Sequence, residues 1–397
     1  MNVWIINEYA GSPRYGMEFR HYYLGKELVR QGYNVTIISS SYSHLFRNPP
    51  NPGFEIIDGV RYLWLDTLNY GASHSKLRVL KWLLFTFKLF FLPVRLSRPD
   101  LIIVSPMAPF PVLPAYFLKK CYKSKLIFEV KDIWPMSLIE LGKFSPRHPL
   151  IILMSIIELF ALKKCDELVS NLQNYGEYIK ERGVNREFTL ISNGIDLDEM
   201  SVVTPLSEDI KSLLPKDHFI VGYTGTVGSS DTLDILLKAS ELISCETGIA
   251  FVIVGDGIEL EHLKSKYRKS NNIYFIPPIP KNQIQSMLSL FDVCYLGWKK
   301  QNIYKYGTSA NKLYDYMYSG KPILHAFDGQ GDVVKAANCG LTVQAENPDA
   351  VAVGILELYN MTEKHRQLIG FNGRNYVLEN YAYKNIARRY CSIFESN

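Results

Sequence analysis

The sequence predicts an α/β protein made of two doubly wound, Rossmann-like domains that face a cleft. Its 397 residues exceed the roughly 100–200 of a common single domain. Short apolar runs rich in β-branched residues alternate with helical stretches, as in βαβ units. A polar stretch with two prolines, at 194–216, indicates a linker between the halves. The composition, 47% hydrophobic and 21% charged, excludes a disordered chain, a collagen and a coiled coil.

Six strands are expected in the first half and five in the second. The run at 3–6 is short and has no basic segment before it, so it predicts a buried first strand rather than a signal peptide. Because helical stretches separate the runs, we expect parallel sheets. The predicted strands are 3–6, 35–38, 60–65, 101–104, 126–130 and 188–191, followed by 219–224, 250–254, 273–276, 293–296 and 341–343.

Charge is divided unevenly along the chain. Residues 1–190 hold 24 Lys and Arg against 16 Asp and Glu, a net +8, whereas 191–397 hold 20 against 23, a net −3. The basic half is therefore expected to meet an anionic partner: a membrane, a nucleic acid or a phosphorylated substrate. The six cysteines lie far apart without metal-binding spacing, which indicates reduced thiols.

Two apolar stretches raise the question of membrane contact. Residues 149–162 are too few to span a bilayer and include Glu158, so a buried core helix is predicted there. Residues 76–98 carry six basic residues and no acid. They predict a helix lying on an anionic membrane, with Lys81 and Lys88 at the headgroups and Trp82 dipping inward. The alternative is a helix whose apolar face covers the sheet.

A predicted helix in YGTSANKLYDYMYSGKPI (306–323) has the features of a nucleotide site. Ser309 suits its N-cap and Gly320 its end. The free N–H groups at a helix N-terminus attract phosphate, and Lys312 adds a positive charge. Asp315, one turn on, can accept two hydrogen bonds from a ribose diol. The alternative is a capped surface helix without a ligand.

Two loops after predicted strands carry glycines that let a ligand approach the backbone. Gly225 and Gly228 follow the strand at 219–224, and Gly16 follows the first strand. In open α/β sheets, ligands bind at the carboxyl ends of the strands. We therefore expect both loops to face the predicted cleft.

Six stretches of the sequence carry a family resemblance. Two of them are N-terminal: MEFRHYYLGKELVRQGYNVTI (17–37) and FEVKDIWPMSLIELG (128–142). The later four are ISNGID (191–196), VIVGDGIELEHLK (252–264), IYFIPPIPKNQIQSMLSLFDVCYLG (273–297) and NKLYDYMYSGKPI (311–323). The later four resemble the C-terminal domain of glycosyltransferase family 4, which has the GT-B fold. The two N-terminal stretches are similar to a subgroup of bacterial O-antigen and capsule transferases that includes L-fucosamine transferases.

The resemblance implies a nucleotide diphosphate sugar as donor, with retention of configuration and no essential metal. We expect the nucleotide to be UDP. Asp315 occupies the second position of the family's paired glutamates, and Gly307 the first. The family's Arg and Lys pair belongs at 226–232, which has no base here, so Lys312 is expected to neutralise the diphosphate. The donor-binding residues implied are Gly16, Thr226, Gly228, Ser309, Ala310, Asn311, Lys312 and Asp315.

The family's His-Asp pair aligns with Lys131 and Asp132. Asp132 is expected to face the reacting sugar or the acceptor hydroxyl and, with Lys312, to take part in catalysis; the alternative is that it caps the next turn. The family's front-face reaction uses the leaving phosphate as base, so no protein nucleophile is required. Residues expected on the acceptor side are Arg20, His21 and His44.

A metal site is not expected. Asp196 and Asp198 match a DxD pattern but lie in the linker rather than after a buried strand. The eight histidines form no zinc-binding pattern. We therefore expect no cofactor.

These observations predict a transferase with two domains. Residues 1–195, with a returning helix at 381–397, face acceptor and membrane, and 196–380 bind the donor. The expected reaction moves a sugar, with an N-acetylated one as a candidate, from UDP to a saccharide linked to polyprenyl diphosphate for a surface polysaccharide. The expected place is the cytoplasmic face of the cell membrane, without nucleic acid. Alternatives are a UDP-sugar 2-epimerase and a non-catalytic subunit that binds sugar or lipid.

Overall fold

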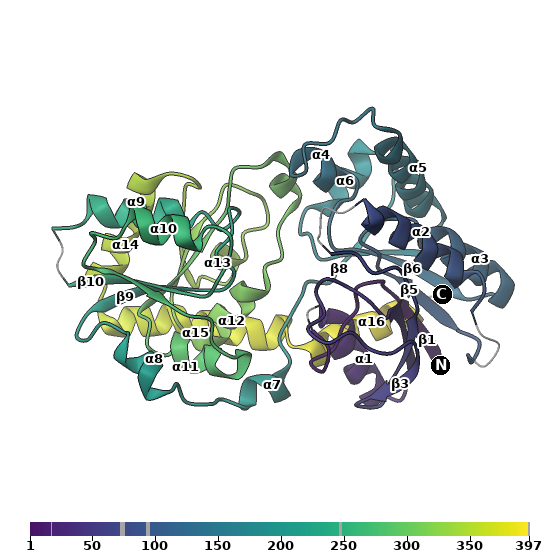
Figure 1. Ribbon diagram of the computed structural model, residues 1–397, viewed down its shortest axis with the longest axis horizontal. Helices are drawn as coiled ribbons and strands as arrows, with labels where there is room; N and C mark the ends of the chain where they lie inside the picture. The colour runs from purple at the N-terminus through teal and green to yellow at the C-terminus, as the bar shows by residue number, and fades with distance from the viewer. Residues whose placement is uncertain (17, 72–75, 93–95, 246–247, 396–397) are drawn as a thin grey trace. The chain divides into compact units, whose positions relative to one another are not determined.

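The computed structural model describes the whole chain except residues 17, 72–75, 93–95, 246–247 and 396–397. The chain folds into two compact units (Figure 1). The N-terminal unit takes in Met1–Asn193 and also Tyr383–Asn397, and the C-terminal unit is Gly194–Ala382. These bounds lie close to the sequence-based ones. Of the predicted helix 381–397, residues 383–395 belong to the N-terminal unit, whereas 381 and 382 belong to the C-terminal unit.

An eight-stranded sheet forms the centre of the N-terminal unit, in the order β3-β4-β2-β1-β5-β6-β7-β8. All neighbours are parallel except β3 and β4, which are antiparallel. Ile5 of the central β1 lies opposite Ile37 and Ile103 on its two neighbours. The strands are β1 Asn2–Ile6, β2 Asn34–Ser40, β3 Gly53–Ile57, β4 Val60–Leu65, β5 Leu101–Val104, β6 Lys125–Val130, β7 Glu167–Ser170 and β8 Thr189–Leu190.

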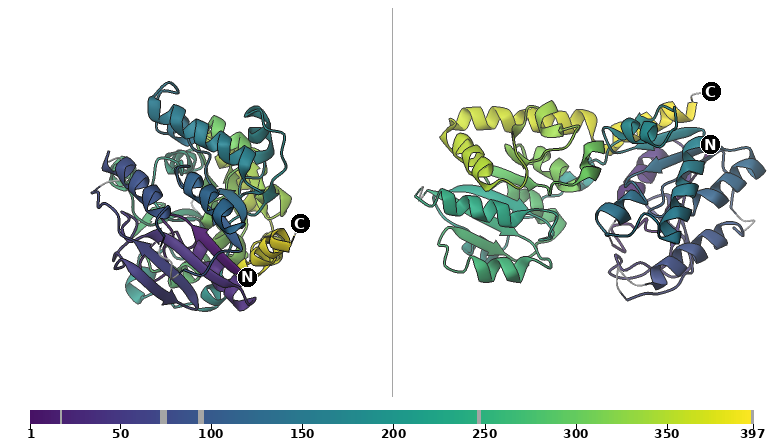
Figure 2. Two further views of the ribbon diagram at one scale, coloured as in Figure 1. Left: turned by 90° about the vertical axis from the view of Figure 1, so that its right-hand side faces the viewer. Right: turned by 90° about the horizontal axis from the view of Figure 1, so that it is seen from above.

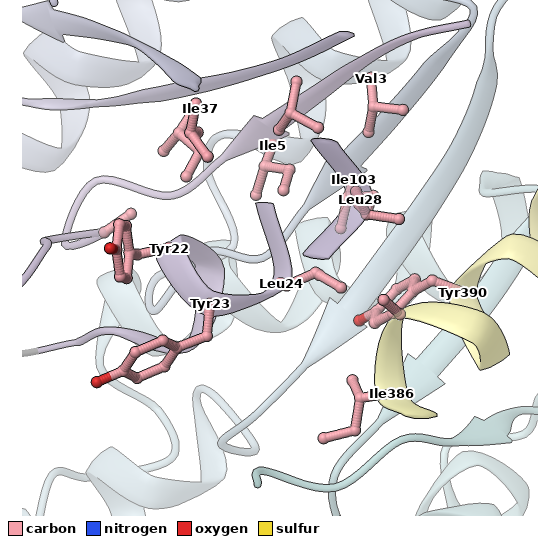
Figure 3. Packing of buried hydrophobic residues seen from close by; sticks show 14 of the residues in the cluster. Val3, Ile5, Tyr22, Tyr23, Leu24, Leu28, Ile37, Ile103, Ile386 and Tyr390 are labelled. Carbon is pink, nitrogen blue, oxygen red and sulfur yellow. The ribbon is translucent and has the colours of Figure 1, made fainter. Parts of the chain in front are cut away.

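The C-terminal helix completes the core of this unit. Ile386 and Tyr390 pack with Leu24 of the first helix and with Ile5 (Figure 3). Both views of Figure 2 show this helix, in yellow, against the N-terminal unit. The helices of the unit are α1 Arg20–Arg30, α2 Leu77–Leu89, α3 Val112–Tyr122, α4 Met136–Glu140, α5 Pro149–Lys164, α6 Tyr175–Glu181 and α16 Tyr383–Glu395.

The C-terminal unit has a six-stranded parallel sheet in the order β11-β10-β9-β12-β13-β14. Ile220 packs in one cluster of buried residues and the next residue, Val221, in another, so helices cover both faces. The strands are β9 Phe219–Thr224, β10 Ile249–Val254, β11 Ile273–Ile276, β12 Val293–Gly297, β13 Ile323–Ala326 and β14 Gly340–Val343.

Helices and short 3-10 turns connect the strands of the C-terminal unit. They are α7 Leu197–Ser201, α8 Glu208–Ser212, α9 Leu233–Leu242, α10 Leu260–Lys266, η1 Lys281–Gln283, α11 Ile284–Leu288, η2 Asn302–Tyr306, α12 Asn311–Ser319, α13 Val333–Ala336, α14 Pro348–Asn360 and α15 Glu363–Asn380. The two doubly wound units confirm the predicted fold class.

The strand predictions were correct but incomplete. Each predicted run overlaps a strand, and the sequence did not predict β3, β7 and β13. The core helix expected at 149–162 is α5, but the structure exposes three of its large apolar side chains, Ile152, Leu153 and Ile156. Apolar residues therefore lie on all sides of this helix, but only one side of it is buried. Among the described helices, none is long and apolar enough to cross a membrane.

Candidate functional site

The helix predicted to bind nucleotide is α12. It begins at Asn311, and Ala310, in an extended conformation, holds the N-cap position without a side-chain hydrogen bond. The prediction of Ser309 as the cap is therefore wrong; its hydroxyl lies 3.1 Å from the Tyr314 hydroxyl instead. The helix ends at Ser319, and the next residue, Gly320, is its C-cap with a left-handed φ of 72°, as predicted for a glycine stop.

Lys312, in the first turn of α12, reaches the carboxyl end of β9. Its ammonium donates to the Tyr223 hydroxyl at 2.5 Å and to the Asp231 carboxylate, and it lies 4.4 Å from the centre of the Tyr223 ring. A side chain at Gly225 would meet this ammonium at 3.2 Å. Burial lowers the pKa of Lys312, and the charge of Asp231 opposes that change. The lysine is thus a partly buried cation held at the loop after β9.

The loop after β9 contains the predicted donor residues Thr226 and Gly228. It packs against the loop after β10, where the Val227 amide donates to the Asp256 carbonyl at 2.8 Å. A side chain at Gly255 would lie 1.9 Å from the Gly225 carbonyl oxygen, so only glycine permits this approach. Thr226 remains exposed and Gly228 half-buried, on the loop whose Asp231 holds Lys312.

Asp315 lines a small pocket of the C-terminal unit. Within the described part of the chain, its carboxylate makes no hydrogen bond, although Gln285 donates to its backbone carbonyl at 3.1 Å. Burial raises the pKa of Asp315 to about 6, while the charge of Lys281 lowers it and that of Glu199 raises it further. The residues around the pocket are Glu199, Met200, Val202, Lys281, Asn282, Ile284, Gln285 and Asp315.

The backbone at Gly307 is adapted to glycine. Its φ is 109°, a value that residues with a side chain rarely adopt, and its amide donates to the Tyr304 carbonyl at 3.1 Å. The resemblance places the first family glutamate at this position. A glutamate would strain this backbone, so the backbone conformation of the loop explains why glycine stands here.

Arg20 and His21, expected on the acceptor side, are buried instead. Both reach Glu129 of β6: the Arg20 Nη2 at 2.7 Å and the His21 Nε2 at 3.0 Å. Tyr390 of α16 donates to the same carboxylate. Burial disfavours the charge on Glu129, but Arg20 and His21 hold its pKa well below the usual range. The predicted acceptor role of Arg20 and His21 is corrected to a structural one.

The other N-terminal site predictions have different surroundings. His44 is half-buried, with its Nδ1 2.7 Å from the Tyr70 hydroxyl. Asp132 is exposed after β6 and does not cap α4, whose N-cap is Pro135. Gly16 packs against the chain at Phe46, and a side chain there would lie 2.6 Å from the Leu45 carbonyl oxygen. Gly16 is therefore required by packing whatever its role toward a donor.

The predicted membrane contacts are only partly accessible. Lys81 is 0% exposed and Trp82 is buried with its indole N–H donating to Tyr9, so the expectation that they touch a membrane is wrong. Lys88 is partly exposed. Residues 93–95 of the predicted stretch 76–98 lie outside the described residues.

The DxD pattern has a structural role in the linker. The Asp196 carboxylate accepts a hydrogen bond from the Glu199 amide at 2.9 Å and caps α7. Among the described residues, no group of three or more His, Cys, Asp or Glu side chains could hold a metal ion.

Four site residues were missed by the sequence analysis. Tyr223 and Asp231 hold Lys312, and the ion pair of Lys281 with Glu199, at 2.8 Å, borders the Asp315 pocket. Asp231 lies in the 226–232 loop, and its charge can be read from the sequence, but its contact with Lys312 cannot. Lys281 and Glu199 come together only through the fold.

Comparisons with known proteins relate the chain to glycosyltransferases. The family model described as Glycosyltransferase Family 4 matches residues 15–199, and that of Glycosyl transferases group 1 matches residues 207–375. An uncharacterised glycosyltransferase of Methanocaldococcus jannaschii is 24% identical over 241 residues, which are 59% of this chain. The match likewise takes in 59% of that relative's length.

Solved structures are similar over nearly all of both chains. Sucrose-phosphate synthase from Thermosynechococcus elongatus has a TM-score of 0.74 at 17% identity, covering 99% of this chain and 98% of that one. Anabaena HepE in complex with UDP-glucose has a TM-score of 0.67 at 14% identity, with 100% of both chains covered. WaaG, a glycosyltransferase involved in lipopolysaccharide biosynthesis, has a TM-score of 0.67 at 13% identity, again with 100% covered. With both units matched by family models, the chain belongs to the family 4 glycosyltransferases of the GT-B fold.

Proposed function

We propose that this protein transfers a sugar from a UDP-sugar to a saccharide linked to polyprenyl diphosphate, with retention of configuration and without a metal. The single observation that carries the donor part is the placement of Lys312 and Asp315 one turn apart on α12, with Lys312 at the carboxyl end of β9. A cation there suits a diphosphate, and a carboxylate that lacks hydrogen bonds within the described chain suits a ribose diol.

Lys312 has the properties of a group that stabilises a leaving diphosphate. Its charge is partly desolvated and balanced by Asp231 alone among the described carboxylates that contact it. Negative charge grows on the diphosphate as the glycosyl bond breaks, and a preorganised cation stabilises that state more than the ground state. We propose that the diphosphate shares or displaces Asp231 at the ammonium. The UDP-glucose complex of HepE supports this class of donor.

The acceptor and the place of reaction rest on other observations. The net charge of +8 in residues 1–190 suits an anionic lipid diphosphate and an anionic membrane. Asp132, exposed at the carboxyl end of β6, is the group we propose to face the acceptor hydroxyl or the reacting sugar. The similarity to WaaG supports a role in a bacterial surface polysaccharide, such as an O-antigen or a capsule, at the cytoplasmic face of the membrane.

Binding of the donor can be tested by calorimetry with UDP-N-acetylglucosamine. Asp315→Ala removes both ribose contacts and should weaken binding about 100-fold or more, because two hydrogen bonds to a charged group are lost and each contributes roughly 1.5–3 kcal/mol. Asp209→Ala, at an exposed aspartate of the same unit, is the matched control and should leave the affinity unchanged. Equal affinity in the Asp315 variant would show that the site is wrongly assigned.

Transfer itself is measured by mass spectrometry, with a series of UDP-, GDP- and dTDP-sugars and a short polyprenyl diphosphate saccharide. We expect product with a UDP-sugar, with the anomeric configuration kept, and the same rate in the presence of a chelator. Conversion of UDP-N-acetylglucosamine to its 2-epimer without any acceptor would instead identify an epimerase. Failure to turn over any sugar nucleotide would indicate a binding subunit.

A further inference from the structure

Helix α2 turns its polar side chains into the protein. The Arg78 Nε and the Trp82 indole N–H both donate to the Tyr9 hydroxyl, at 3.0 and 2.9 Å. The Lys81 ammonium is fully buried and lies 4.4 Å from the centre of the Tyr9 ring. Three polar side chains of one helix therefore converge on a single tyrosine after β1. This is the reverse of an ordinary surface helix, whose charged residues face water.

A buried carboxylate accounts for the inward position of Lys81. Glu8 follows β1 and is 1% exposed, and neither of its carboxylate oxygens has a hydrogen-bond partner among the described residues. Burial raises the pKa of Glu8, and the positive charge of Lys81 opposes that rise. A buried charge needs a compensating charge nearby. Lys81 thus compensates the charge of Glu8 in the protein interior and is not available to lipid headgroups.

The outward side of α2 is a stripe of large apolar residues. Leu80, Leu83 and Phe87 are spaced by three and four residues, which places them on one side of the helix. Phe87 is 60% exposed, and Phe91, just beyond the helix, is 71% exposed. Their rings lie 5.0 Å apart. Water therefore contacts an apolar stripe that a folded protein would ordinarily cover.

The stripe continues over two neighbouring helices. The rings of Phe90 and Phe117, after α2 and on α3, lie 5.7 Å apart. Tyr116 of α3 packs on Phe160 of α5, with the ring centres 5.1 Å apart. Ile156 of α5 is 60% exposed. Helices α2, α3 and α5 lie together in the N-terminal unit (Figure 1).

The accessible charges carried by these helices are basic, and one acid beside them, Asp166 just after α5, pairs with Lys119 at 2.5 Å. The three helices contain one acid, Glu158, which is buried and bonded to Tyr178 at 2.5 Å and to Arg182 at 3.1 Å. Their solvent-accessible charges are all basic: Arg78, Lys88, Lys119, Lys120, Lys163 and Lys164. Two copies of this surface would therefore repel one another along their basic edges, whereas anionic lipid would attract them.

We propose that a lipid face, made of Leu80, Leu83, Phe87, Phe91, Phe117 and Ile156, inserts into the outer acyl region of an anionic membrane. This inference rests on the proposed function, since it names the surface by which the enzyme would reach a lipid-linked acceptor. Insertion of apolar side chains supplies most of the binding, and the basic residues around them add attraction to anionic headgroups. The mode differs from an electrostatic contact through Lys81, which the fold has turned inward.

The test is flotation of the full-length protein with vesicles of phosphatidylglycerol and phosphatidylethanolamine. Leu83→Ser, Phe87→Ser and Ile156→Ser are combined in one variant. The matched control combines Leu242→Ser, Val353→Ser and Phe371→Ser, which are similarly exposed in the C-terminal unit. We expect the lipid-face variant to bind about tenfold or more weakly and the control to bind like the parent. Because apolar insertion resists screening, most binding should persist at about 0.5 M salt.

Three results would overturn the proposal. They are equal flotation of the lipid-face variant, loss of all binding by the parent at high salt, and a parent dimer in solution that the variant abolishes. Circular dichroism and donor affinity identify a variant that has merely failed to fold, and Leu83→Ala with Phe87→Ala then replaces it. Transfer to a water-soluble acceptor is assayed on the same proteins. If transfer persists while flotation fails, only the lipid face is wrong; if flotation succeeds without transfer, only the proposed function fails.

Discussion

Burial acts against the charges of both Asp315 and Lys312. It raises the pKa of the aspartate to about 6 and lowers that of the lysine. An anionic ligand beside Lys312 offsets the cost of its buried charge, and a diol beside Asp315 supplies the donors that its carboxylate lacks within the described chain. The proposed donor would therefore add charge compensation at Lys312, beside that from Asp231, and would supply hydrogen bonds at Asp315. Perturbed groups of this kind gather at functional sites.

The affinity for UDP-N-acetylglucosamine should depend on pH through Asp315. Only the ionised carboxylate accepts two hydrogen bonds from the ribose, and a pKa of about 6 leaves it largely protonated at pH 5. Binding should therefore strengthen as pH rises from 5 to 7 and then level off. This sugar nucleotide has no phosphate proton that titrates in the same range. Calorimetry at a series of pH values measures the effect.

Asp315→Asn is the control for that titration. It keeps the size of the side chain but cannot ionise, so its weaker affinity should stay flat between pH 5 and 7. A variant that kept the parent's pH profile would show that another group titrates. The charge of Lys281 lowers the pKa of Asp315, so Lys281→Met should move the parent's midpoint upward.

At the scale of residues, the sequence allowed us to predict only those pairs of site residues that are close along the chain. Lys312 and Asp315 are three residues apart on one helix, so helical periodicity alone put them on one side. Asp231 is the partner of Lys312 across the fold, and no local pattern encodes that contact. Gly307 could be located by spacing, but its backbone conformation, with φ 109°, could not.

At the scale of elements, one buried carboxylate joins three parts of the N-terminal unit. Glu129 of β6 binds Arg20 and His21 of α1 and Tyr390 of α16. Arg20 also donates to the Ser192 carbonyl at 2.7 Å, beyond β8. Helix α16 comes after the whole C-terminal unit in the chain. The bond from Tyr390 to Glu129 therefore holds this returning helix to the sheet of the N-terminal unit.

Arg20→Met should destabilise the N-terminal unit severely. Removing one partner leaves the Glu129 charge buried, which typically costs about 3–5 kcal/mol. Arg14→Met is the matched control: Arg14 is exposed and pairs with Glu55 at 2.7 Å, so its loss should hardly shift the unfolding midpoint. Chemical unfolding followed by circular dichroism measures both. Equal midpoints for the two variants would contradict the structural role of Arg20.

Elements were predictable where they are long or continuously apolar. The fully buried run of β9 was found, whereas β3 alternates exposed and buried residues at the edge of its sheet. In β7 only Leu168 and Val169 are apolar, so no continuous apolar run marks it. Strand β13 follows Pro322 directly, and the predicted end of the preceding helix hid it. For α2, periodicity defined two faces but not which one lies inward, because Glu8 and Tyr9, far away in sequence, decide that.

At the scale of the whole molecule, the two units have separate cores. The cluster around β1 combines residues of 3–191 with residues 383–394 of α16. The two clusters that cover the C-terminal sheet draw only on residues 195–381. The chain therefore leaves the first unit once and returns to it once, and the second unit is a continuous segment with both faces of its sheet covered.

A fragment of residues 194–382 should fold by itself and bind the nucleotide. Its core is complete without the rest of the chain, and Lys312, Asp231 and Asp315 all lie within it. We expect a cooperative thermal transition, and a UDP affinity within about tenfold of the parent because the proposed ribose and phosphate contacts are retained. If the fragment folded without binding UDP, contacts from the N-terminal unit would be essential to the donor site.

A chain of residues 1–193 is the opposite case. It would lack Ile386, Tyr390 and Phe394 from its core, so we expect it to aggregate. If residues 1–193 folded as stably as the parent's N-terminal unit, α16 would contribute nothing to that core.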